Sequence, residues 1–89
     1  MPRRDDEVLR AIQVLRATLA DSAETIADLA ESTAEIFEKA ALRGDADRRL
    51  MFAAWEREIA RVERRNAAQL RNASGVSLDL ERLPVRPSQ

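Results

Sequence analysis

Residues 8–42 contain neither proline nor glycine, and their apolar side chains recur at alternating intervals of four and three residues. This spacing predicts one long α-helix with a coiled-coil type seam. The seam consists of Val8, Ile12, Leu15, Leu19, Ser22, Ile26, Leu29, Thr33, Ile36 and Ala40. A second row, which we call the alanine row, follows the same rhythm beside it: Ala20, Ala23, Ala27, Ala30, Ala34, Phe37 and Ala41. Two adjacent rows make a wide apolar face, so we expect this helix to have more than one neighbour.

The predicted helix limits indicate a helical hairpin. Asp5 can cap a first helix of about residues 5–43, and Gly44 can end it in the left-handed conformation. Asp45 can then cap a second helix of about residues 46–73. A connection this short predicts antiparallel neighbours. We therefore expect a helical hairpin over residues 1–75 and a partly disordered C-terminal arm over 76–89.

The second helix has its own seam, which is Phe52, Trp55, Ile59, Val62, Asn66, Gln69 and Ala73. An antiparallel hairpin turning at Gly44 and Asp45 pairs residues whose numbers sum to about 89, which places this bulky row against the alanine row. A sum of 88 would instead match the large side chains of the first helix to the second helix. In either register one row stays uncovered, and a monomer would expose a long apolar strip.

The economical way to cover this strip is a second hairpin. The sequence therefore predicts an all-α fold, a long antiparallel two-helix coiled coil that dimerises into a four-helix bundle. Small-against-large packing assigns the alanine row to the chain's own second helix. The predicted dimer interface is then the set that we call the large row: Ile12, Leu15, Leu19, Ile26, Leu29 and Ile36.

The C-terminal arm is predicted to be either extended or a single helical turn, because Val76, Leu78 and Leu80 alternate with polar residues. The second helix is about eleven residues shorter than the first, so the first ten or so residues of helix 1 overhang. Leucines and valine of the arm could fold back over that overhang.

Carboxylates of the first helix form a ladder with the same three-four spacing. They are Asp21, Glu24, Asp28, Glu31, Glu35 and Glu38. We expect them on the helix side opposite the apolar face. There they would form a solvated surface, a docking face for a basic protein partner, or a weak ladder for divalent cations.

Arginines of the second helix form a basic stripe, which is Arg57, Arg61, Arg64 and Arg71. Such a stripe can contact phosphates of RNA or DNA, or it can simply be solvated. In the apolar seam of this helix, Asn66 and Gln69 are expected to form a polar layer that fixes the helix register. A ligand pocket at these two residues is the alternative.

The composition argues against catalysis. The chain has no cysteine and no histidine, and its formal net charge is −1. It therefore lacks the residues most often used as nucleophile, general base and metal ligand, and we predict no enzyme activity, cofactor or metal. No apolar run is long enough to cross a bilayer and no signal peptide is evident, so we predict a cytoplasmic protein without membrane contact. Fourteen arginines against one lysine favour a GC-rich, bacterial genome.

The leading functional prediction is a non-enzymatic, homo-oligomeric helical module that acts as a structural or regulatory protein–protein interaction unit. Its partners would be a second copy of itself and an unidentified protein. The alternative is an RNA- or DNA-binding regulator that uses the basic stripe. ROP, a hairpin that dimerises into a four-helix bundle, provides an analogy of shape for this alternative.

Overall fold

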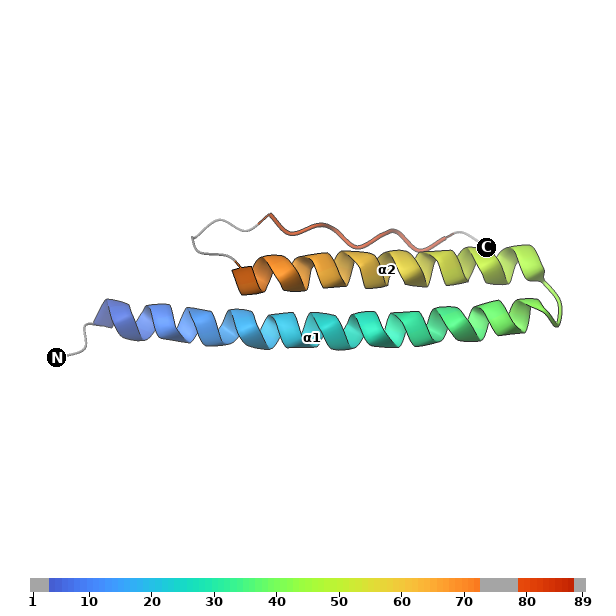
Figure 1. Ribbon diagram of the computed structural model, residues 1–89. Coiled ribbons are helices and arrows are strands. Elements are labelled where there is room, and N and C mark those ends of the chain that lie inside the picture. Colours follow the sequence, from blue (N-terminus) through green and yellow to red (C-terminus); the bar gives the residue numbers. More distant parts are fainter. Residues whose placement is uncertain (1–3, 73–78, 88–89) are drawn as a thin grey trace.

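The computed structural model describes residues 4–72 and 79–87 of the chain. It consists of two helices, α1 (Arg4–Ala41) and α2 (Ala46–Asn72), which pack side by side as an antiparallel hairpin (Figure 1). The molecule is elongated and measures 66 × 18 × 17 Å. The predicted all-α hairpin is confirmed. The predictions for residues 1–3, 73–78 and 88–89, including Ala73 in the second seam, lie outside the described residues.

The connection between the helices differs from the predicted one in its backbone. Helix α1 ends at Ala41, and the N–H groups of residues 42–44 donate to carbonyls three residues earlier at 2.9 to 3.4 Å, which tightens the last turn. Gly44 has a φ of 139°, whereas Asp45 has a φ of 49° and holds the left-handed helical conformation assigned to Gly44 from the sequence. The guanidinium of Arg49 donates a second hydrogen bond to the Ala40 carbonyl near the C-terminus of α1.

The alanine row of α1 faces α2, as predicted. Ala20, Ala27 and Ala34 are fully buried. The row packs in two described clusters, which are Ala20 and Ala23 with Ala67 and Leu70, and Ala27 and Ala30 with Ala60 and Ile59. Near the turn, the rings of Phe37 and Phe52 stack with centroids 5.5 Å apart, as the register sum of 89 requires.

The prediction for the α2 side of this contact was wrong in part. Ala53, Ala60 and Ala67, which are seven residues apart, are all buried, and the latter two pack on the alanine row. In each cluster the alanines of α1 therefore meet one alanine and one large side chain of α2, Leu70 or Ile59, where small against large was expected throughout. The bulky seam of α2 is divided: Phe52 and Ile59 contact α1, whereas Trp55 and Asn66 bond to the C-terminal arm.

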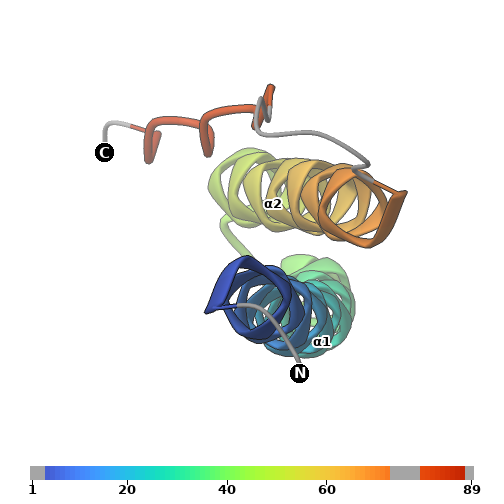
Figure 2. The same ribbon diagram turned by 90° about the vertical axis from the view of Figure 1, so that its left-hand side faces the viewer.

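The described part of the arm, residues 79–87, has no helical turn and runs back along α2 toward the hairpin connection (Figure 1). Viewed along the helices, it lies on a side of α2 turned away from α1 (Figure 2). This part of the arm therefore does not cover the overhang of α1, so the prediction was wrong for Leu80 and Leu83, whereas Val76 and Leu78 lie outside the described residues. No described residue before Ala20 is buried, so the first turns of α1 project beyond α2 as predicted.

Candidate interaction surface

The large row of α1 is exposed along its whole length. Leu15, Leu29 and Ile36 have exposed fractions of 61%, 63% and 66%. The other members of the row, Ile12, Leu19 and Ile26, are also exposed. Because α2 covers the alanine row beside them, these six side chains form one apolar strip on a single edge of the hairpin.

A groove lies beside the middle of this strip and has a volume of about 270 Å³. Residues of α1, α2 and the arm line it: Leu19, Ser22, Ala23, Ile26, Glu63, Asn66, Leu70 and Leu80. Leu80, itself 46% exposed, brings the arm to the same apolar edge as the large row. The candidate surface is therefore built from three segments of the chain.

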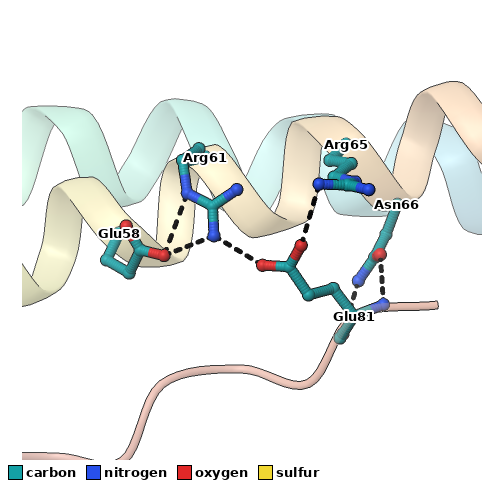
Figure 3. A network of polar contacts seen from close by, with 5 residues as sticks. All are labelled: Glu58, Arg61, Arg65, Asn66 and Glu81. Atoms are coloured by element: carbon teal, nitrogen blue, oxygen red, sulfur yellow. Dashed lines mark hydrogen bonds and ion pairs between the residues drawn. The ribbon is translucent and has the colours of Figure 1, made fainter.

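The arm is held in this position by a polar network centred on Glu81 (Figure 3). The Asn66 amide nitrogen donates to the Glu81 carbonyl at 3.0 Å, and the Glu81 N–H donates to the Asn66 amide oxygen at 2.9 Å. The Glu81 carboxylate pairs with Arg61 at 2.5 Å and Arg65 at 3.3 Å, and Arg61 also bonds Glu58. Asn66 thus fastens the arm, whereas the sequence had suggested a polar layer between the helices.

Two more contacts hold the arm nearer the hairpin connection. The Trp55 indole N–H donates to the Pro84 carbonyl at 3.3 Å, and the Arg86 guanidinium lies 5.8 Å from the centre of the Phe52 ring. Burial beside the arm raises the pKa of the Glu56 carboxyl, and the positive charge of Arg86 partly offsets this rise. The arm is thus held on α2 at positions from Phe52 to Asn66, spread over about four turns of the helix.

The opposite edge of the hairpin carries the charges. Arg57 pairs with Glu38 at 2.5 Å, Arg64 pairs with Glu31 at 2.5 Å, and Arg64 also reaches Asp28 at 2.9 Å. Arg71 pairs with Asp21 and Glu24. We call this set of ion pairs the charged edge. The hydrogen bond from Arg57 lowers the pKa of the Glu38 carboxyl.

These pairs correct the predicted position of the acidic ladder. Its carboxylates do not lie opposite the apolar face, because five of the six reach across to α2. Glu35, the remaining one, is exposed. The structure therefore brings the acidic ladder together with three arginines of the predicted basic stripe and leaves Arg61 on the arm side of α2.

A sequence signal for the charged edge existed. Glu24, Glu31 and Glu38 are spaced by seven residues, and so are Arg57, Arg64 and Arg71. In an antiparallel pair of helices, glutamates and arginines with the same seven-residue spacing come into contact once every two turns when the register aligns them. In the observed register each of these glutamates pairs with one of these arginines, and the two residue numbers of each pair sum to 95.

The described residues present no group of three or more carboxylates placed to hold a metal ion. Within the same residues, neither helix combines the length and apolarity needed to cross a membrane. No family model, no curated protein and no solved structure matches the chain.

Proposed function

We propose that this chain is a non-enzymatic, self-associating helical module, in which two hairpins pack through their large rows into a four-helix bundle. The bundle would serve as a structural or regulatory protein–protein interaction unit. The observation that carries this proposal is the apolar strip on one edge of the hairpin, with six large aliphatic side chains exposed in one row.

The distribution of charge supports the same proposal. The charged edge lies on the other side of the alanine row from the strip, so its ion pairs stay in water when the strip is covered. Exposed pairs of this kind contribute little to stability, but they keep that edge soluble. One edge of the hairpin is thus suited to association and the other to solvent.

Sedimentation equilibrium at micromolar concentration tests the proposal. We expect a mass twice the chain mass of 10.0 kDa. A folded monomer at that concentration would contradict it, because the strip would then be stable in water without a partner.

Nucleic-acid binding remains the alternative, and the ion pairs weigh against it. Three of the four arginines of the basic stripe already have carboxylate partners on α1, so phosphates would have to replace those partners. The test is binding of a labelled RNA and DNA pool at low and high salt, compared with a variant in which Arg57, Arg61 and Arg64 are glutamine. Salt-dependent binding that the variant loses would favour this alternative.

A further inference from the structure

We propose that the face of α2 beneath the arm is a binding site for extended, proline-containing segments of a partner protein, and that the arm occupies this site as an intramolecular competitor. The ligand is a polyproline II segment in which an acidic residue is followed by prolines three and six positions later. This inference rests on the proposed function for the role of an interaction unit, and it gives that unit a partner on a face other than the large row.

The described arm is half-buried at every third residue. Glu81, Pro84 and Pro87 are half-buried, whereas the other residues of 79–87 are exposed. Three residues per turn is the period of the polyproline II helix, and proline has the fixed φ that this helix requires. Proline also favours extended backbone at the residue before it. The arm is therefore a segment whose sequence favours the bound conformation before it docks, as in other proline-rich ligands.

Two side chains of α2 recognise the main chain of the arm. The Asn66 amide bonds both the N–H and the carbonyl of Glu81, and the Trp55 indole N–H donates to the carbonyl of Pro84, three residues further along. Main-chain groups are present in every peptide, so these bonds select an extended conformation and not one particular sequence. Proline-rich segments dock in grooves lined by aromatic side chains, which Trp55 and Phe52 supply here. The same face is therefore suited to a segment of another chain.

The charges of the site give the ligand a direction. At one end, Arg61 and Arg65 bind the Glu81 carboxylate, at 2.5 and 3.3 Å (Figure 3). At the other end, the positive charge of Arg86 stabilises the Glu56 carboxylate. The site is thus basic where the ligand begins and acidic where it ends. A segment with its acidic residue first and an arginine between its two prolines is complementary to both ends.

The way in which the arm is held makes it a displaceable occupant. Its large side chains Leu80, Leu83 and Val85 are exposed, the last to 91%, so they contribute little burial on α2. The arm of a second copy is disfavoured as occupant, because only six residues, 73–78, join each arm to its own α2 and give it a high effective concentration there. A partner segment has to outcompete the tethered arm, so the arm sets a threshold for binding.

The probe for this site is a synthetic peptide of residues 79–87 with a fluorophore at its N-terminus, and fluorescence anisotropy measures its binding. The peptide is titrated into the full-length wild-type chain and into full-length Glu81→Pro. Proline at position 81 lacks the N–H that Asn66 accepts and the carboxylate that the two arginines bind, so it frees the arm and leaves α2 unchanged. We expect Glu81→Pro to bind the peptide roughly tenfold more tightly than the wild-type chain, whose own arm competes.

Matched variants in the Glu81→Pro background assign the binding to this face. Asn66→Ala removes both main-chain bonds and should weaken peptide binding by roughly tenfold, whereas Gln69→Ala, about one turn further along α2, should leave it unchanged. A second peptide, with alanine in place of Pro84 and Pro87, has the same charges but no fixed φ. It should bind several times more weakly, because more conformational entropy is lost when it docks.

The emission of Trp55, the only tryptophan of the chain, reports on the same site. It should shift to longer wavelength in Glu81→Pro and return when the peptide binds, while circular dichroism shows that the helices persist. An emission spectrum unchanged in Glu81→Pro would show that Glu81 does not hold the arm. A released arm without saturable peptide binding would show that the face does not accept a separate segment. Either result would overturn the inference.

Two further results would also overturn it. Equal binding of the alanine peptide would show that the site does not select a polyproline II segment. Displacement of the peptide by unlabelled wild-type chain as effectively as by free peptide would show that the occupant is the arm of a second copy. The sedimentation mass is measured independently of these titrations. A monomeric chain that binds the peptide would therefore contradict self-association alone, and a dimer that does not bind it would contradict this inference alone.

Discussion

Asn66 determines more of the structure than its position in an apolar seam suggests. Its amide satisfies both the N–H and the carbonyl of Glu81, an arrangement that neither a shorter apolar side chain nor a carboxylate can reproduce. The arm has no hydrogen-bonded secondary structure of its own in the described range. Its position therefore depends on a few side chains of α2, of which Asn66 is a buried polar one.

We expect Asn66→Ala to release the arm while the hairpin stays helical. The two lost hydrogen bonds are expected to cost about 1–3 kcal/mol of arm docking. Because Trp55 is the only tryptophan and bonds to the arm, its fluorescence emission should shift to longer wavelength. Gln69→Ala, one turn further along the same side of α2, is the matched control. An unchanged emission spectrum in Asn66→Ala would contradict this account of the arm.

Two glutamates should respond to pH in opposite ways. The raised pKa of Glu56 means that the folded state disfavours the ionised carboxylate. Glu56 therefore destabilises the folded state least below the ordinary pKa of 4.5, where the carboxyl is protonated, and destabilises it more as the pH rises through the folded-state pKa. Glu56→Gln should therefore raise the melting temperature at pH 7, and this gain should vanish at pH 3.5.

Glu38 has a lowered pKa, so its stabilising effect is present above 4.5 and is lost as the pH falls through its folded-state value. Glu38→Gln should lower the melting temperature at pH 7 and have little effect at low pH. Thermal melts of both variants at a series of pH values check the two signs. If each variant changed the melting temperature equally at pH 7 and in acid, the ionisation of neither glutamate would affect the stability of the fold.

At the scale of the helix, the two rows of α1 differ in what lies against them. Leu29 and Ala30 are neighbours in the sequence, yet Leu29 is 63% exposed and Ala30 is 5% exposed in a cluster with Ala60. A substitution at Leu29 should affect association, and a substitution at Ala30 should affect the packing of α1 against α2.

If two hairpins associate as proposed, Leu29→Glu should dissociate the dimer, because a carboxylate in the centre of the covered strip would be a buried charge without a partner, which costs several kcal/mol. Ala30→Leu should crowd the contact between α1 and α2 and cost about 1–3 kcal/mol, lowering the melting temperature of a dimer that stays folded. Sedimentation and thermal melts of both variants measure these effects. A dimer that survives Leu29→Glu but not Ala30→Leu would reverse the assignment of the two rows.

The sequence could predict the helices and the buried row of α1, because both follow from local periodicity and from the absence of helix breakers between residues 8 and 42. The face of α2 could not be predicted in the same way. Its seam is regular, yet Phe52 and Ile59 contact α1 while Trp55 and Asn66 bond to the arm, and periodicity does not say which segment covers which part of a seam. The ion pairs of the charged edge were not predicted, because the seven-residue spacings of the glutamates and arginines become informative only once the register of α1 against α2 is known.

At the scale of the whole molecule, the alanine-rich contact between the helices has a thermodynamic consequence. Alanine removes little apolar surface from water when it is buried, so the hairpin alone gains little free energy of folding. Six large aliphatic side chains are instead exposed on the strip. If that strip is covered only by a second copy, helix formation and association become one equilibrium, and the chain's stability depends on how much of it is present.

The melting temperature should therefore rise with protein concentration. We expect dilution from about 100 μM to about 1 μM to lower it by several degrees, with circular dichroism as the measure, since each tenfold dilution of a folding-coupled dimer shifts the equilibrium by about 1.4 kcal/mol. A melting temperature that is the same at both concentrations would mean that the single hairpin is stable by itself. A chain built in this way would remain structured only above a threshold abundance, so its folded population would report its own concentration.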